Sequence, residues 1–302
     1  PLLDAVINQS DTEYFGRNST SEVYALIESD LTEAAAVLPA AADAFFGRAT
    51  KGAANGILAK VKLTTGDYAG AETLLQDLID DTEYALMGDY NDVFYTEGNN
   101  EILFAIPYIE DGIDAQDFSY EMTAFGAASG LNYLTSDFIA AMDPLDIRKS
   151  TLQNSLLPGE TAKYLTFSSD TRLCGNDWVV LRLADVYLMF AEAKMAGGPS
   201  TASVSAINAY NSIRNRAGLT ELATDGSATL TKEMLSDERR IELAFENHRL
   251  YDLIRMGLAE STLGAFASSE GFSFVATDLL LPIPQGEINI SGGALTQNPG
   301  YQ

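Results

Sequence analysis

The stretch Glu238-Arg-Arg-Ile-Glu-Leu-Ala-Phe-Glu-Asn-His-Arg-Leu-Tyr-Asp-Leu-Ile-Arg-Met-Gly257 indicates the fold of this chain more strongly than any other. Apolar residues recur here at helical spacing and form a stripe that Glu238 interrupts: Met234, Ile241, Phe245 and His248. Charges of opposite sign follow one another about three residues apart: Arg239, Glu242, Glu246, Arg249, Asp252 and Arg255. Such order is not typical of a solvated linker, so the stretch predicts a helical element that packs against the rest of the fold.

Two carboxylates of this stretch, Glu238 and Glu242, lie four residues apart on the predicted helix. An acid on an apolar stripe is tolerated only when a cation pairs with it. We therefore expect at least one of the two to be half buried or more and within salt-bridge distance of an arginine, with Arg182 and Arg249 as the first candidates. Arg239 and Arg240 are further possible partners. This pattern favours a structural ion-pair network over a pair of catalytic carboxylates.

Helical hairpins account for most of the remaining chain. Ser19-x-x-Glu22 is a capping box at the start of a helix that ends at Pro39. Two hairpins share one plan, with turns at Gly66-Asp67 and at Gly197-Gly198-Pro199 and small or apolar residues at helical spacing on both sides. The pattern predicts a mostly α fold with a tetratricopeptide-like scaffold of helical hairpins.

The middle of the chain has a different character. From Gly88 to about Asp170 the helical period is lost, and Glu101-Ile-Leu-Phe-Ala-Ile-Pro-Tyr108 has the composition of a short strand. Aromatic residues between positions 90 and 133 are about twice as dense as in the whole chain. Sugar rings stack on aromatic rings, and their hydroxyls need the amide and carboxylate groups that are interspersed here. We predict a glycan site with these stacking candidates: Tyr108, Phe118, Tyr120, Phe125 and Tyr133.

Two alternatives apply to these aromatic rings. Many of them could anchor long loops to the scaffold, since buried aromatic rings are common. Trp178 is the obvious competitor for stacking on a sugar because it is the only tryptophan of the chain. Its position just before an expected Val-Val-Leu-Arg helix favours core packing instead.

Residues suited to catalysis are scarce. His248 is the only histidine and Cys174 the only cysteine, so any triad would have to use one of them, and both are expected to pack structurally. Zinc-binding and phosphate-loop motifs are absent from the sequence, and Asp111-x-x-Asp114-x-x-Asp117 is read as a solvated acidic loop because it lacks EF-hand spacing. We predict no catalytic residue, no metal site and no cofactor. The formal net charge of −25 argues against nucleic acid as a partner.

Three motifs together resemble the SusD/RagB-like family of outer-membrane nutrient-binding lipoproteins. They are the stretch at 238–257, the segment Asn176-Asp-Trp-Val-Val-Leu-Arg-Leu-Ala-Asp-Val-Tyr-Leu-Met-Phe-Ala-Glu-Ala193, and a closing pair formed by Leu280-Leu-Pro-Ile-Pro-Gln-Gly-Glu-Ile288 and Leu295-Thr-Gln-Asn-Pro-Gly-Tyr301. The chain departs from the pattern at Asn247, where the family has Gly, and at Met256, where it has Trp. Asn tolerates a left-handed backbone, so the helix end is expected to survive the first change.

The resemblance implies one SusD-like domain over residues 1–302, with helical hairpins in 1–87, a loop-rich ligand-binding insert in 88–175, and C-terminal hairpins with a closing segment in 176–302. It also implies that the N-terminal part of the fold, a signal peptide and a lipidated cysteine precede Pro1. An apolar helical face near residues 23–38 would then lack a partner within this chain.

The function implied by the resemblance is that of a non-enzymatic protein that is lipid-anchored to the extracellular face of the outer membrane. It would capture oligosaccharide or polysaccharide and deliver it to a SusC-like TonB-dependent transporter. Two alternatives remain open. One is a peptide-binding member of the same family, and the other is an all-α glycoside hydrolase.

Overall fold

The computed structural model describes residues 1–302 except 4, 9–11, 123–132, 155–156, 158, 166–169, 171 and 302. The chain divides into two compact units, of which the larger is Leu31–Arg249. Pro1–Asp30 and Leu250–Gln302 together form the smaller. Helices dominate the described residues and strands are few, so the predicted mostly α fold is confirmed.

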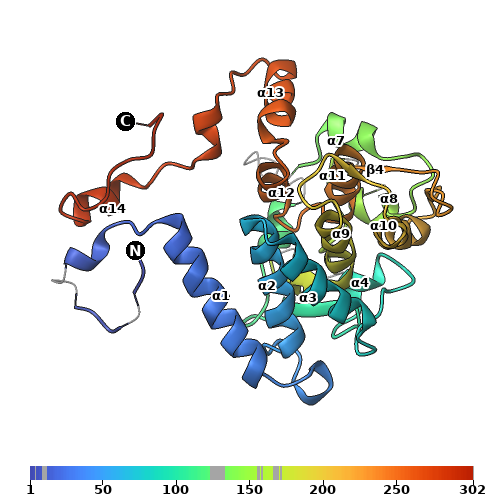
Figure 1. The fold of residues 1–302 in the computed structure, drawn as a ribbon, viewed down its shortest axis with the longest axis horizontal. Helices are drawn as coiled ribbons and strands as arrows, with labels where there is room; N and C mark the ends of the chain where they lie inside the picture. The colour runs from blue at the N-terminus through green and yellow to red at the C-terminus, as the bar shows by residue number, and fades with distance from the viewer. Residues whose placement is uncertain are drawn as a thin grey trace. The chain divides into compact units, whose positions relative to one another are not determined.

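The first hairpin of the larger unit consists of α2 (Lys51–Thr65) and α3 (Tyr68–Asp80), which lie side by side (Figure 1). Its turn has the geometry that the sequence predicts. Gly66 ends α2 with φ 84°, a left-handed conformation that costs glycine little, and the Asp67 side chain caps α3 by accepting from Gly70 N at 3.0 Å. Gly66 therefore ends α2, and Asp67 starts α3.

The second hairpin pairs α9 (Leu183–Ala193) with α10 (Val204–Arg216). All but one of the α9 residues are buried, because α9 packs against α3 on one side and α10 on the other. The resulting apolar core is built mainly from these helices and includes Leu63, Leu75, Leu78, Leu183, Val186, Met189 and Phe190. Both predicted hairpins are therefore present, and their small and apolar residues form the core.

Two antiparallel strands, β1 (Ile102–Ile106) and β2 (Trp178–Arg182), connect the insert to this scaffold. The β1 strand is where the sequence predicts it, but the expectation of a helix over Val179–Arg182 is wrong. This β-branched run pairs with β1, from which it is separated by more than 70 residues of chain, and the helix begins only at Leu183. A second small pair joins β3 (Ser200–Thr201) to β4 (Leu230–Thr231).

The stretch 238–257 contributes to two helices instead of one. The first, α11 (Lys232–Glu242), ends where Phe245 and Asn247 both take positive φ angles of 62°. The second, α12, covers Arg249–Arg255. The left-handed backbone expected at Asn247 is confirmed. Phe245 is also left-handed, so the helix ends before Asn247, whereas the apolar stripe implied one continuous helix through this point. Short helices occupy the insert: α4 (Asp92–Tyr95), α5 (Phe118–Glu121), α7 (Ser136–Ala141) and α8 (Lys149–Leu152).

A buried ion-pair network holds these elements together. The Glu242 carboxylate, which is fully buried, pairs with Arg148 at 2.9 Å, with Arg182 at 2.5 Å and with Arg216. Glu246 continues the network through its ion pairs with Lys163 at 2.6 Å and Arg182 at 2.8 Å. Since the partners come from the insert, β2 and α10, the network joins segments that are distant in sequence.

The expected burial and pairing of Glu238 and Glu242 are thus confirmed, with Arg182 as one of the predicted partners. Glu238 pairs with Arg148 at 2.6 Å and with Arg214 at 3.1 Å. Arg249 donates to the carbonyl and hydroxyl oxygens of Ser236, both at 2.9 Å. Glu238, Glu242 and Glu246 therefore pair with other elements, whereas Asp252 and Arg255 pair along α12 at 2.8 Å as a ladder implies.

The smaller unit contains the capping box and the closing segment. Ser19 N donates to Glu22 Oε2 at 2.8 Å at the start of α1 (Thr20–Val37), as predicted, and no residue of α1 is buried. Gln297 bonds both backbone groups of Ile283 at 2.8 Å, which folds the two halves of the closing motif together. The remaining elements are η1 (Thr12–Phe15), α13 (Ala259–Ser269), η3 (Ala276–Leu279) and α14 (Gln285–Ile290).

In the part of the chain that the structure describes, no helix combines the length and the apolar character needed to cross a membrane.

Candidate functional site

A cluster of aromatic rings lies where β1 leaves the scaffold and enters the insert. Phe118 contacts Tyr108 with ring centroids 6.0 Å apart and Trp178 with centroids 5.1 Å apart, both edge-to-face. Trp178 in turn stacks on Tyr164 at 5.6 Å. Tyr108, Phe118 and Trp178 are partly exposed, whereas Tyr164 is buried. We call these three partly exposed rings the aromatic platform.

Buried polar groups hold the platform in position. The backbone of Gln116 exchanges two hydrogen bonds with Cys174, which ties the start of α5 to the segment before β2. The Gln116 side chain accepts from Ser119 N at 3.0 Å, so α5 is fixed at its first turn. Tyr108 N donates to Asp177 Oδ1 at 3.1 Å, next to Trp178. The three rings therefore come from separate segments and share one rigid support.

Three further aromatic rings of the insert, of which Tyr90 and Phe94 are buried and Tyr95 is half-buried, have an anchoring role. Tyr90 donates its hydroxyl to the Glu242 carbonyl at 2.7 Å, and Tyr95 donates to the Leu165 carbonyl at 2.7 Å. Phe94 packs edge-to-face against both Tyr90 and Tyr164. Loop anchoring, which the sequence left open as an alternative, is thus the observed role of several of these rings.

The five predicted stacking residues do not all gather at one point. Tyr108 and Phe118 belong to the platform, and Tyr120 lies on the same short helix with the Arg172 guanidinium 3.7 Å from the centre of its ring. Tyr133 is 48% exposed and covers Gly159, where an added Cβ would lie 1.9 Å from the ring. Phe125 lies outside the described residues.

Sequence reasoning placed Trp178 in the core and did not single out Tyr164 or Arg172. Trp178 does pack against other rings, as expected, but it also remains partly exposed beside two predicted stacking residues. Nothing in the sequence around Trp178 indicated that its ring would lie beside them. The pairing of β2 with β1 places Trp178 opposite Ile106, two residues before Tyr108.

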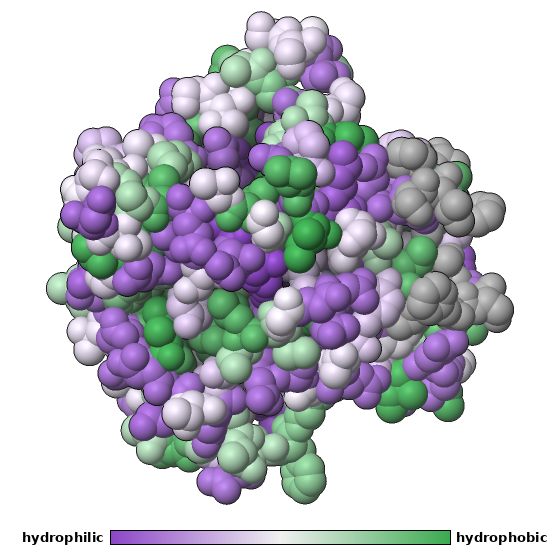
Figure 2. Space-filling model, turned by 90° about the vertical axis from the view of Figure 1, so that its right-hand side faces the viewer, coloured by the Kyte–Doolittle hydropathy of each residue, from purple (hydrophilic) through white to green (hydrophobic). Residues whose placement is uncertain are grey.

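Two acidic residues close to the platform in the sequence, Asp111 and Asp177, accept hydrogen bonds from backbone N–H groups. Asp111 Oδ1 accepts from Ile113 N and Asp114 N, both at 2.7 Å, and these hydrogen bonds hold the pKa of Asp111 below its usual value. Burial raises the pKa of Asp177, although the hydrogen bond from Tyr108 N opposes this effect. Figure 2 shows the side of the molecule that bears α8, α10 and β4, where hydrophilic residues separate small groups of hydrophobic ones.

The residues that a catalytic mechanism would need have structural partners. Lys60 Nζ lies 3.3 Å from His248 Nδ1, and Asp185 lies 3.8 Å from the same nitrogen. Cys174 is buried, as expected. Over the described ranges, no group of three or more His, Cys, Asp or Glu residues is arranged to hold a metal ion.

Comparisons with known proteins agree with this architecture. The SusD family model matches residues 161–301. SusD-like protein P2 from Formosa agariphila is 27% identical over 361 residues, which cover 100% of this chain and 69% of that protein. Starch-binding protein SusD from Bacteroides thetaiotaomicron is 28% identical over 199 residues, which cover 64% of this chain and 33% of that protein.

A solved structure has the same fold. The structure of a laminarin-binding SusD-like protein superposes with a TM-score of 0.73 at 25% identity and covers 94% of this chain and 70% of that chain. The family match is confined to the C-terminal half, whereas the structural likeness extends over nearly all of the sequence. Residues 161–301 therefore match the SusD family, and the fold over nearly the whole chain resembles that of a SusD-like protein.

Proposed function

We propose that this protein binds a neutral glycan on the aromatic platform and delivers it to a SusC-like TonB-dependent transporter. The platform is the observation that carries the proposal, because three partly exposed rings on a rigid support offer the apolar faces on which sugar rings stack. The proteins described as laminarin-binding and starch-binding among its relatives support the same ligand class.

The negative charge of the protein limits the classes of ligand that it can bind. Asp111, Asp114, Asp117 and Asp177 are near the platform residues in the sequence, and the chain carries 43 acidic residues against 18 basic ones. A polyanionic glycan would be repelled, whereas a neutral glycan can use the carboxylates as hydrogen-bond acceptors. A cationic peptide would also suit these charges, so peptide binding is the competing outcome of the test.

The test is calorimetric titration with laminarin oligosaccharides, malto-oligosaccharides and cationic peptides. Replacing Tyr108 or Phe118 by Ala should weaken glycan binding by ~1–3 kcal/mol, by analogy with stacking on bases. Tyr108→Ala should leave the fold intact, whereas Phe118→Ala should also lower stability, because the Phe118 ring packs on Tyr164 and Trp178. Tyr120, Phe125 and Tyr133 complete the scan as the other predicted stacking residues. Trp178→Ala should lower both affinity and stability, because its ring also packs on Tyr164. Unchanged glycan affinity in all six variants would refute this placement of the site.

Delivery to a transporter and a non-enzymatic role each have their own test. A SusC-like transporter encoded beside this gene should co-purify with the full-length protein, and loss of the protein should slow glycan uptake at limiting concentration. The pure protein incubated with polysaccharide should release no new reducing ends. New reducing ends would favour the glycoside hydrolase alternative.

A further inference from the structure

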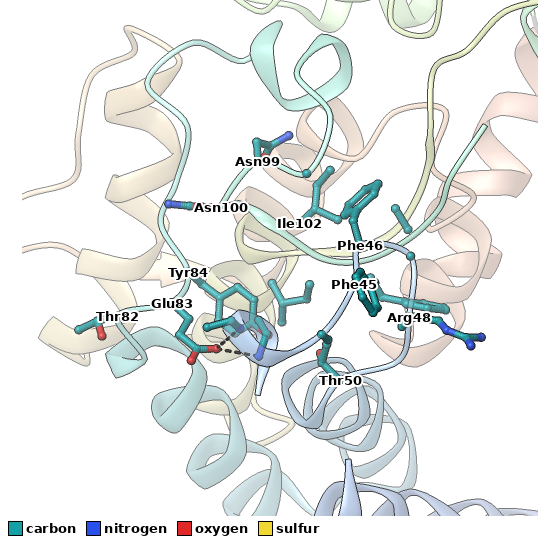
Figure 3. A pocket seen from close by; sticks show the side chains of 18 residues that line it. Phe45, Phe46, Arg48, Thr50, Thr82, Glu83, Tyr84, Asn99, Asn100 and Ile102 are labelled. Carbon is teal, nitrogen blue, oxygen red and sulfur yellow. Dashed lines mark hydrogen bonds between the residues drawn. The ribbon is translucent and has the colours of Figure 1, made fainter. Parts of the chain in front are cut away.

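A hollow of about 390 Å³ lies beside β1, on the segment that leads into the aromatic platform. Three stretches of the larger unit line it: the loop from Ala41 to Thr50, residues 82–84, and the stretch from Gly98 to Ala105. Figure 3 shows Phe45 and Phe46 on one side of this hollow and Thr82, Glu83 and Tyr84 on the other. None of these residues belongs to the site predicted from the sequence.

Two consecutive phenylalanines make the apolar wall. Phe45 is 86% exposed and Phe46 is 42% exposed. Exposed rings of this size forgo the stabilisation that burial would give, roughly 1.5–3 kcal/mol for a fully buried side chain, so packing against the described residues does not explain their position. Gly47 fixes the loop that carries them, since its φ is 80° and an added Cβ would lie 2.7 Å from the Pro107 ring.

The opposite wall offers hydrogen-bonding groups that the described part of the protein leaves unused. The side chains of Thr82 and Asn100 are exposed at the hollow and form no hydrogen bond with the described residues. Glu83 is held in place because its Oε2 accepts from Ala41 N at 2.8 Å and from Ala42 N at 3.3 Å. An apolar wall facing hydroxyl and amide groups is the arrangement that a sugar ring requires.

The hollow and the aromatic platform follow each other along one segment of chain. Ala105 lines the hollow, Gly47 packs against Pro107, and Tyr108 belongs to the platform. An extended chain rises about 3.3 Å per residue, so Ala105 and Tyr108 are at most roughly 10 Å apart along it. A short oligosaccharide spans such a distance.

We propose that this hollow is a second subsite for the same glycan, so that one oligosaccharide occupies the platform and the hollow together. The inference rests on the proposed glycan-binding function and adds to it a chain-length requirement and a named residue pair. A sugar ring stacks on Phe45 or Phe46 while its hydroxyls face Thr82, Glu83 and Asn100. The ligand is then a neutral oligosaccharide longer than the platform alone can hold.

The test measures affinity against chain length by calorimetry, from disaccharide to octasaccharide, in the laminarin and maltose series. In the wild type, affinity should rise with length by about 10-fold or more once the chain reaches the hollow, in line with one stacking contact. The double variant Phe45→Ala/Phe46→Ala should lose this rise and keep the wild-type affinity for the shortest ligand that binds. Phe45→Leu, which keeps an apolar side chain without a ring, should also lose most of it.

Phe272→Ala is the matched control, because Phe272 is 72% exposed and does not line the hollow. It should bind like the wild type at every length, and all variants should keep the wild-type melting temperature. An equal rise with length in the double variant, or no rise in the wild type, overturns the second subsite and leaves the proposed function standing. A wild type that binds no oligosaccharide refutes both.

Discussion

His248 is held neutral by its surroundings. Burial lowers the pKa of the imidazole to about 4, and the Lys60 ammonium beside Nδ1 acts in the same direction. Asp185 opposes this effect, but its carboxylate already pairs with Lys60 at 2.7 Å and with Arg239 at 2.8 Å. The only histidine of the chain therefore completes a buried cluster of charges without carrying one itself.

This environment predicts a pH dependence of stability. An unfolded histidine titrates near pH 6.5 and the folded one near pH 4, so the unfolded state binds more protons between these values. Stability should fall as the pH drops through this window, by about 2 kcal/mol between pH 7 and pH 5. Urea unfolding at the two pH values measures the loss, and His248→Gln should remove most of it. A loss of equal size in the variant would contradict the assignment to His248.

Glu242, in contrast to His248, is kept charged by its surroundings. Arg216, Arg182 and Arg148 surround its carboxylate and outweigh the desolvation that opposes them, which holds its pKa well below the usual range. Glu242→Gln would leave these buried guanidinium groups with less negative charge and should cost ~3–5 kcal/mol in the free energy of unfolding. Asp237→Asn, an exposed change on the same helix, should shift that free energy by less than ~0.5 kcal/mol. Equal effects of the two substitutions would show that the network is not needed for stability.

The sequence revealed that these carboxylates are buried but revealed only one of their partners. Glu238 and Glu242 were recognised because they interrupt or border an apolar stripe, which is a local signal. Arg148 and Arg216 are brought to them by the tertiary fold, across 94 and 26 residues of chain for Glu242, and no spacing rule marks them. Tyr108 and Phe118 were likewise predicted from a local signal, the density of aromatic residues between positions 90 and 133. Tyr164 lies outside that range, and only the tertiary fold brings it to the cluster.

Helix α2 packs closely because it carries two buried glycines. A Cβ at Gly56 would lie 2.4 Å from Leu181 Cδ2 on β2, and one at Gly52 would lie 2.1 Å from the Tyr84 hydroxyl. The predicted hairpins were correct because turn residues and helical periodicity are local. The strand at Trp178–Arg182 was not, because its extended form depends on β1, a partner far away in the sequence.

Replacing a buried glycine of α2 by alanine should have the opposite of the usual effect on stability. Gly→Ala inside a helix normally stabilises by roughly 0.5–1 kcal/mol. At Gly56 the added methyl group collides with Leu181, so Gly56→Ala should instead destabilise by ~1–3 kcal/mol and lower the melting temperature. Gly264→Ala in α13 is the control, since its nearest neighbour is Phe274 Cδ1 at 3.8 Å. Thermal melts that rank the two variants in the reverse order would contradict the close packing of α2 on β2.

The net charge of −25 acts over the molecule as a whole. It repels polyanions at a distance but exerts little net force on a neutral sugar. The excess of acidic over basic residues was visible in the composition. The distribution of buried and exposed charges was not, because most of the arginines named above form ion pairs inside the fold.

Salt therefore separates the ligand classes. Affinity for a neutral oligosaccharide should change less than about 2-fold between roughly 50 mM and 500 mM NaCl, because screening acts only on charge pairs. Binding of a cationic peptide should weaken strongly over the same range. Calorimetry at the two salt concentrations checks this, and a steep salt dependence for the glycan would argue against stacking as the main source of affinity.

The position of Trp178 gives the protein an optical reporter of its own. As the only tryptophan of the chain it supplies all of the indole fluorescence, and it lies edge-on to Phe118 and stacked on Tyr164, so a ligand on these rings would change the polarity that the indole senses. The emission maximum should shift on titration with a bound sugar and move to longer wavelength when the larger unit unfolds. Occupancy and unfolding can then be followed in the same cuvette without a label.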